Sequence, residues 1–196
     1  LRYGEIVPKE LMKYPKDIRR QNCMKLRVYK YLVSGGYIKH VPSNLLLFTT
    51  KGNPTYVNAS ISLDDSLARL VGYYLSEGCI YSDVGRKGSR RERIFFSFHE
   101  DEDEYISDVQ NLLTIIGVRS CIREEPKTHG RSVVTSSRVL AWFFKEFLNL
   151  GTSCYDKKLP DFVFKHTRFL NAVIKGLFSG DGSLQFSYDG KYPNIV

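Results

Sequence analysis

Two stretches of nine residues, 104 positions apart, share one pattern. Residues 70–78 read Leu-Val-Gly-Tyr-Tyr-Leu-Ser-Glu-Gly, and residues 174–182 read Ile-Lys-Gly-Leu-Phe-Ser-Gly-Asp-Gly. In each, an apolar run with helical spacing carries a glycine, then a small residue four positions later, then a carboxylate and a second glycine. An internal repeat of this kind predicts two copies of one structural unit within the chain.

The small residues of the repeat predict close packing between the two helices. Residues four apart lie on one face of a helix, so the small residues of each copy come together: Gly72 with Ser76, and Gly176 with Gly180. Two such faces let backbones approach with almost no side chain between them. If the helices pack in parallel, Glu77 and Asp181 emerge side by side at their C-terminal ends.

This pair of carboxylates indicates a metal site. Each acid would face the negative pole of its own helix and the charge of the other acid. A divalent cation removes that repulsion, and carboxylate oxygens favour Mg²⁺ or a related hard cation. A single helix ending in Asp-Gly or Glu-Gly is common and indicates little, so the interpretation depends on the matched pair.

The charge distribution points to a polyanionic partner. The net charge is +8 and the isoelectric point is about 9.3. Residues 1–62 hold 11 Lys or Arg and 3 Asp or Glu, whereas the charges of residues 63–196 balance. A metal held by two carboxylates, with a polyanion as partner, suits phosphodiester hydrolysis.

The first 60 residues are predicted to form a basic, mainly helical region. Residues 8–34 favour short helices, and residues 37–40 and 45–50 favour two strands around a Pro-Ser-Asn turn. Helices followed by such a ribbon suggest a winged-helix-like DNA-binding extension. A solvated pair of basic helices packed on the main domain explains the same pattern equally well. Residues 49–58 are the predicted linker.

Residues 61–150 predict the order α-β-β-α-β-β-α. The first helix is expected to begin at a capping box of Ser62 and Asp65 and to end at Glu77, with Gly78 as a left-handed stop. The other elements are expected in the following ranges: strands 79–84 and 93–99, helix 101–116, strands 118–124 and 131–136, and helix 137–149. The acidic residues 100–104 suit a helix N-terminus better than a metal site.

Residues 151–196 are predicted to contain a link, the second motif helix from about residue 167, and the start of a second half. Only 14 residues follow Gly182, whereas the first half uses the 72 residues 79–150 to complete its sheet and helices. We therefore expect a second chain or a missing C-terminal segment to complete the second half. An unfinished sheet edge also tends to pair with another chain.

The paired motifs resemble those of the LAGLIDADG homing endonucleases, over about residues 60–190. The segments Gly-Tyr-Tyr-Leu-Ser-Glu-Gly, Lys-Lys-Leu-Pro and Gly-Leu-Phe-Ser-Gly-Asp-Gly are most similar to archaeal intein-borne members. The resemblance implies an α+β fold of two pseudo-twofold αββαββα halves with saddle-shaped sheets on a long DNA site. It implies Mg²⁺ or Mn²⁺ held by Glu77 and Asp181, helped by the carbonyls of Ser76 and Gly180. It also implies cleavage of both DNA strands, with an auxiliary basic residue that no motif identifies here.

The strands fit a DNA-binding face, because polar and apolar residues alternate along them. Their outward residues and the basic hairpin loop give the candidate DNA contacts: Arg86, Lys87, Arg90, Arg91, Arg93, Ser97, His99, Arg119 and Arg123. Each of these also suits a merely solvated hairpin. The remaining histidines, His40, His129 and His166, are interpreted as surface or capping residues.

Two other functions compete with site-specific DNA cleavage. A degenerate member would bind DNA or intron RNA without hydrolysis, and a winged-helix regulator would recognise DNA through residues 8–50. The four cysteines match no zinc spacing and are read as reduced thiols of a cytoplasmic protein, and no apolar run is long enough to span a bilayer.

Overall fold

The computed structural model describes residues 7–11, 23–40, 42–49, 55–85, 88, 90–181, 184–186 and 193–195, and of the last two stretches only the backbone. The chain divides into two compact units, residues 1–43 and 44–196. Among the described residues, no helix has the length and apolar character needed to cross a membrane.

The first unit contains one described helix, α3 (Leu26–Ser34). Val28 and Leu32 are buried on one of its faces and pack with Val7. Residues 37–40 form no strand, so the predicted ribbon is wrong. The amides of Tyr37 and Ile38 instead donate to the carbonyl of Leu32 and complete the end of the helix, at 2.9 and 3.3 Å.

A short ladder within the second unit takes the place of that ribbon. Strand β1 (Leu46–Leu47) pairs antiparallel with β2 (Val57–Asn58), which lies inside the stretch predicted as a linker. The buried Val57 joins the main hydrophobic core, and this anchors the ladder to the second unit.

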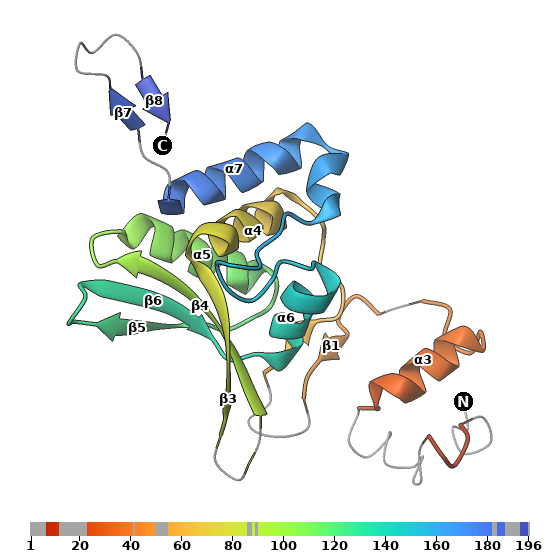
Figure 1. Cartoon of the computed structure of the whole chain (residues 1–196). Helices are drawn as coiled ribbons and strands as arrows, with labels where there is room; N and C mark the ends of the chain where they lie inside the picture. The colour runs from red at the N-terminus through yellow and green to blue at the C-terminus, as the bar shows by residue number, and fades with distance from the viewer. Residues whose placement is uncertain are drawn as a thin grey trace. The chain divides into compact units, whose positions relative to one another are not determined.

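The second unit has the predicted α-β-β-α-β-β-α order. The elements are α4 (Asp65–Glu77), β3 (Gly78–Val84), β4 (Arg90–His99), α5 (Asp103–Ile115), β5 (Cys121–Glu125), β6 (Gly130–Thr135) and α6 (Arg138–Trp142). The last helix continues as one π-helical turn, Phe143–Phe147. The strands form one antiparallel sheet in the order β3-β4-β6-β5, and the helices lie against one of its faces (Figure 1).

The core lies between the sheet and these helices. Ile94, Phe96 and Phe98 alternate along β4 toward the helices and are buried, while the residues between them point to the other face. The ring of Tyr74 on α4 meets Phe96 and Phe144 edge-on, with centroids 6.2 and 5.2 Å apart. The sheet therefore keeps one face free, as the sequence alternation predicts.

Two predicted details of α4 are corrected. The N-cap is Asp64, whose Oδ1 accepts from the Leu67 amide at 3.0 Å, so the helix begins after residue 64 rather than at Ser62. Gly78 is extended, with φ −87° and ψ 147°, and is not a left-handed stop. A Cβ there would collide with the side chain and backbone of Tyr74, which explains the glycine sterically.

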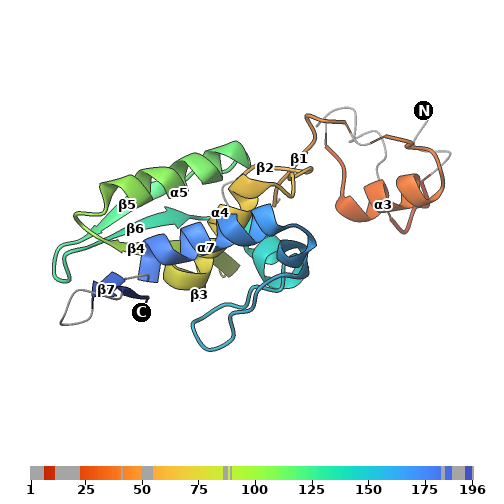
Figure 2. The ribbon, with the colours of Figure 1, turned by 90° about the horizontal axis from the view of Figure 1, so that it is seen from above.

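A second helix–hairpin unit follows. A 3₁₀ turn (Asp161–Lys165) leads into α7 (Thr167–Asp181), and β7 (Leu184–Phe186) then pairs antiparallel with β8 (Pro193–Ile195). Helix α7 lies alongside α4 in both ribbon views (Figure 2). The mixed fold with antiparallel sheets is the α+β class that the sequence predicts.

Candidate metal centre and nucleic-acid interface

Helices α4 and α7 pack through their glycines. A Cβ added at Gly72 would collide with the carbonyl oxygen of Val173 and would lie 2.9 Å from the Cα of Gly176. A Cβ added at Gly176 would collide with the carbonyl oxygen of Arg69. Because the obstructing atoms belong to the backbone, any larger residue would force the two helices apart.

The same contact brings the two motif acids together at the ends of the helices. A Cβ added at Gly180 would collide with the Ser76 hydroxyl and would lie 2.8 Å from Oε1 of Glu77. The carboxyl of Glu77 lies close enough to Asp181 for the two negative charges to interact. The helices are therefore parallel at this point, and acids 104 positions apart are neighbours.

Burial and charge repulsion favour the protonated form of Glu77. Burial raises the pKa of Glu77 most, the negative charges of Asp181 and Glu102 raise it further, and Lys157 opposes them, giving a pKa of about 7. A carboxyl that keeps its proton up to near-neutral pH beside a second acid forms a natural site for a divalent cation, which replaces the proton.

The donor set suits a hard cation with other ligands from solvent or substrate. Among the residues described, no cluster of three or more His, Cys, Asp or Glu side chains could hold a metal. The two carboxylates would therefore be supplemented by carbonyl, water or phosphate oxygens, as is usual for Mg²⁺. The residues present fit a magnesium-like cation.

Lys157 is a site residue to which sequence reasoning assigned no role. Its Nζ donates to the carbonyls of Leu75 and Ser76, at 2.9 and 3.1 Å, and lies 5.7 Å from the centre of the Tyr74 ring. Burial lowers its pKa, and the nearby Cys79, Asp181 and Glu77 partly counter that effect. The Lys-Lys-Leu-Pro segment was the only signal for it, and one predicted ligand, the Ser76 carbonyl, already accepts from this ammonium group.

A hollow of about 280 Å³ opens beside Glu77, between the end of β4 and the β5–β6 turn. His99, Glu102 and His129 are among its lining residues. Nδ1 of His129 lies 2.8 Å from Oε1 of Glu100. His129 has a left-handed backbone, with φ 51°, and is an exposed residue of the turn. The acidic run 100–104 provides the cap and first turn of α5, with Asp103 paired to Arg131.

The predicted DNA contacts divide into three groups. Arg91, Arg93, Ser97, His99 and Arg123 occupy the free face of the sheet, as the strand register requires. Arg90 belongs to the opposite face, where it pairs with Glu92 at 2.9 Å, and Arg119 is exposed just before β5. Arg86 and Lys87 lie outside the described residues.

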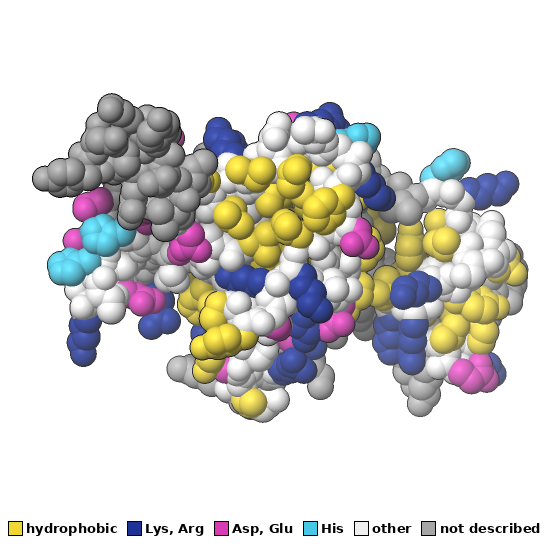
Figure 3. Space-filling model, turned by 45° about the horizontal axis from the view of Figure 1, so that its top comes forward, with side chains coloured by type: hydrophobic (Ala, Val, Ile, Leu, Met, Phe, Trp, Pro, Cys, Tyr) yellow, Lys and Arg dark blue, Asp and Glu magenta, His cyan; other side chains and the backbone are white. Residues whose placement is uncertain are grey.

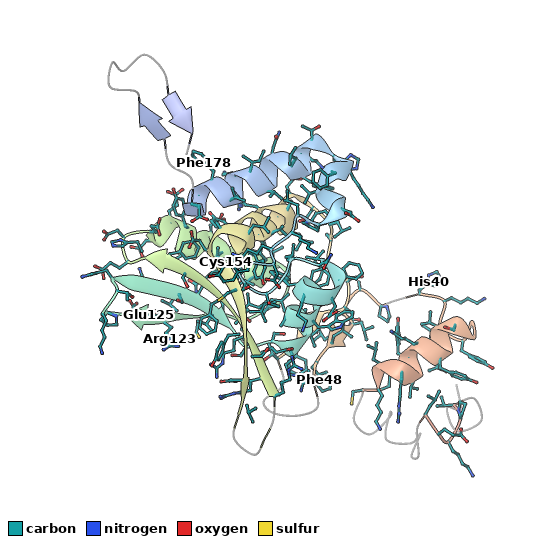
Figure 4. The ribbon with its side chains drawn as sticks, in the orientation of Figure 1. His40, Phe48, Arg123, Glu125, Cys154 and Phe178 are labelled. Carbon is teal, nitrogen blue, oxygen red and sulfur yellow. The ribbon has the colours of Figure 1, made fainter. Side chains whose placement is uncertain are left out.

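The arginines of the free face differ in their partners. Arg91 donates twice to Asp83, at 2.9 and 2.8 Å, and Arg93 lies 3.3 Å from the same carboxylate. Arg123 makes no ion pair with any residue that the structure describes, and Figure 4 shows it on β5 near Glu125. Arg91 and Arg93, at one end of the face, are therefore held in ion pairs, whereas Arg123 has no ion-pair partner among the described residues.

Comparison with protein families identifies a similarity. The family model described as a LAGLIDADG-like domain matches residues 64–148. An uncharacterized protein of Methanocaldococcus jannaschii is 38% identical over 184 residues, which cover 93% of this chain and 20% of that protein. The DNA polymerase II large subunit of Thermococcus kodakarensis is 33% identical over 148 residues, covering 74% of this chain and 8% of that protein.

A third relative belongs to another protein class. An iron-sulfur cluster assembly SufBD family protein of Mycobacterium tuberculosis is 30% identical over 121 residues, covering 60% of this chain and 13% of that protein. The chain thus spans a fifth or less of the length of each of these three relatives.

Two solved DNA complexes are among the structures to which this chain is similar. The homing endonuclease I-DmoI with DNA and Ca is 19% identical, with a TM-score of 0.46, over 61% of this chain and 58% of that chain. The LAGLIDADG homing endonuclease I-GzeII with its DNA target is 12% identical, with a TM-score of 0.40, over 68% of this chain and 65% of that chain.

Proposed function

We propose that this chain, whose residues 64–148 form a LAGLIDADG-like domain, is a site-specific endonuclease that cuts both strands of DNA. The observation that carries the proposal is the pairing of Glu77 with Asp181 at the ends of two glycine-packed helices. Two like charges side by side at helix C-termini, one of them half-buried, are unfavourable for stability, so their presence favours a role in cation binding.

Glu77, Asp181 and the carbonyl of Gly180 would hold Mg²⁺ or Mn²⁺. Such a cation would polarise the phosphate group of the DNA and make a water molecule bound to it more acidic. The Ser76 carbonyl, also predicted as a ligand, would contribute only through the lone pair that Lys157 leaves free.

Lys157 is the proposed auxiliary basic residue. Its ammonium group is fixed by two carbonyls at the end of α4 and interacts electrostatically with both acids. There it can offset the charge of a bound phosphate and exchange a proton with a reacting oxygen. Its lowered pKa makes that exchange easier near neutral pH.

The free face of the sheet and the basic N-terminal region are the proposed DNA-binding surfaces. Arg91, Arg93 and Arg123 lie on the sheet face, and residues 1–62 carry the whole excess of positive charge. Phosphate contacts by such residues provide affinity that falls as salt rises.

The relatives support the interpretation of this chain as a mobile genetic element inserted into other proteins. The same chain matches small parts of a polymerase subunit, an iron-sulfur assembly protein and an uncharacterized protein, which are unrelated by name. We infer that it is an inserted, intein-like homing element. The free thiols of Cys79, Cys121 and Cys154 fit the reducing cytoplasm.

A second chain or a further segment is proposed to cover α7. Ile174 and Leu177 are 53% and 40% exposed, and Figure 3 shows hydrophobic side chains gathered over this helix. Their repeat counterparts on α4, Leu70 and Tyr73, are buried. A second sheet would cover α7 as the first covers α4.

A cleavage assay tests the proposed function. The chain is incubated with DNA that contains candidate insertion sites uninterrupted by the insert, in one reaction with Mg²⁺ and in another with a chelator. We expect cutting of both strands only with Mg²⁺, and Glu77→Gln should abolish cutting while DNA binding persists. Metal-independent binding with no cutting would instead support the DNA- or RNA-binding alternative, which the engaged Ser76 carbonyl favours.

A further inference from the structure

Beyond the pair Asp83 and Arg91 at the distal hairpin, the side chains on the free face of the sheet form four further rows that cross the strands. Residues directly opposite each other in neighbouring strands share a face, so the register defines each row. From the distal hairpin inward, the rows are Tyr81 and Arg93; then Cys79, Phe95, Val134 and Cys121; then Ser97, Ser132 and Arg123; and then His99, Gly130 and Glu125.

The second row is an uncharged apolar band, which we call the apolar row. It contains Cys79, Phe95, Val134 and Cys121. Val134 is only 8% exposed although it lies on the free face, and the Cys121 thiol is 3.7 Å from the Val134 carbonyl. The other rows of this face carry mainly polar and charged side chains, and an apolar strip among them is unneeded for phosphate binding.

The third row is polar. The hydroxyls of Ser97 and Ser132 lie 3.3 Å apart, and the Ser132 hydroxyl is 3.4 Å from Oε1 of Glu125. Arg123 extends this row on β5 without an ion pair among the described residues. An uncommitted guanidinium group retains its donor fork for a base edge, and guanine is its commonest partner.

We propose that the apolar row reads the C5-methyl group of thymine in the major groove, and that Arg123 reads a guanine about two base pairs nearer the cleavage site. This inference rests on the proposed function and specifies its substrate. The thymine methyl group is the main apolar feature of the major groove, and apolar side chains recognise it.

The dimensions agree with this placement. The part of the apolar row on β4, β6 and β5 spans about 10 Å, which fits a major groove about 12 Å wide, and Cys79 on β3 lies one strand spacing beyond it. Successive rows lie two residues apart, roughly 6.7 Å along a strand, which matches two base-pair steps of about 3.4 Å. The third and fourth rows lie on the Glu77 side, because Ser97, His99 and Glu77 line one hollow.

The same chemistry disfavours RNA. Uracil lacks the methyl group, and the major groove of an RNA duplex is too deep and narrow for side chains to read. The apolar row therefore favours a DNA duplex over an RNA duplex of the same sequence.

The test selects bound duplexes from a randomised DNA pool with the full chain and then replaces each thymine of the selected site by deoxyuridine. We expect one position, or two adjacent positions, to lose about fourfold in affinity, the effect of removing one buried methyl group. Phe95→Ala should remove that sensitivity, and Arg123→Ala should relax a guanine preference about two base pairs away by tenfold or more. Phe147→Ala, an exposed aromatic of the π turn, is the matched control and should keep the wild-type profile.

The deoxyuridine scan uses the unmodified protein, so it decides the matter even if Phe95→Ala fails to fold. Binding that is indifferent to every thymine methyl, or equally sensitive in Phe95→Ala, overturns the inference and leaves the proposed function standing. Retention of no duplex overturns the proposed function and this inference with it.

Discussion

Replacement of Glu77 by glutamine should make the metal-free chain less sensitive to pH. In the fold the pKa of Glu77 is about 7, against an ordinary 4.5. Between these values the folded state binds the proton more tightly than the unfolded state, so stability falls as pH rises. Glutamine cannot ionise and avoids that loss.

The full shift of 7 − 4.5 would correspond to roughly 3 kcal/mol. Glu77 is only about half buried, so solvent screening reduces the expected loss to about 1–2 kcal/mol. Urea unfolding at about pH 5 and about pH 8 measures it. Wild type should lose about 1–2 kcal/mol more than Glu77→Gln between the two.

Mg²⁺ should restore the wild type at the higher pH and leave the variant unchanged, because binding to the folded state stabilises it. If both proteins lose the same stability with pH, Glu77 has no raised pKa, and the reasoning from its contact with Asp181 is refuted. Asp161→Asn, an exposed acid of the 3₁₀ turn, is the control for general charge effects.

Three further predictions concern packing, capping and the lysine. Gly176→Ala should lower the free energy of unfolding by about 2–4 kcal/mol, because the added Cβ collides with the Arg69 carbonyl. Lys175→Ala, on the exposed side of the same helix, should change it by no more than about 0.5 kcal/mol. Equal effects of the two substitutions would contradict the helix contact. Asp64→Ala should cost about 1 kcal/mol through the lost N-cap bond, measured by urea unfolding, and no loss would exclude the cap. Lys157→Met should lower the cleavage rate at least 100-fold and leave DNA affinity nearly unchanged. Lys158→Met, which replaces the exposed neighbouring lysine, should cleave at the wild-type rate. Wild-type cleavage by Lys157→Met would show that Lys157 has no role in the site.

The order of elements in the second unit was predictable from local patterns. The alternation of Ile94, Phe96 and Phe98 with polar residues defines β4, and the apolar spacing before Glu77 defines α4. The end of the first helix unit was not predictable in the same way. Residues 37–40 have strand propensity, but the chain reverses after the helix and two of their amides donate to the carbonyl of Leu32, which has no partner within the helix.

The site was only partly predictable for a similar reason. The repeat at an offset of 104 identified both acids, because the glycines that form the helix contact are part of the repeated sequence pattern. Lys157 reaches the end of α4 across 81 residues of chain, and no local spacing reveals such a contact. The pairing of Arg91 and Arg93 with one aspartate also depends on strand register, which sequence fixes only approximately.

Calorimetric titration of Mg²⁺ into the full chain tests the central claim most directly. If Glu77 and Asp181 share one cation, Glu77→Gln and Asp181→Asn should each abolish most of the binding, and the double variant should be no worse than either alone. Binding near neutral pH should also release protons. Unchanged binding in either single variant, or losses that simply add, would contradict a shared site.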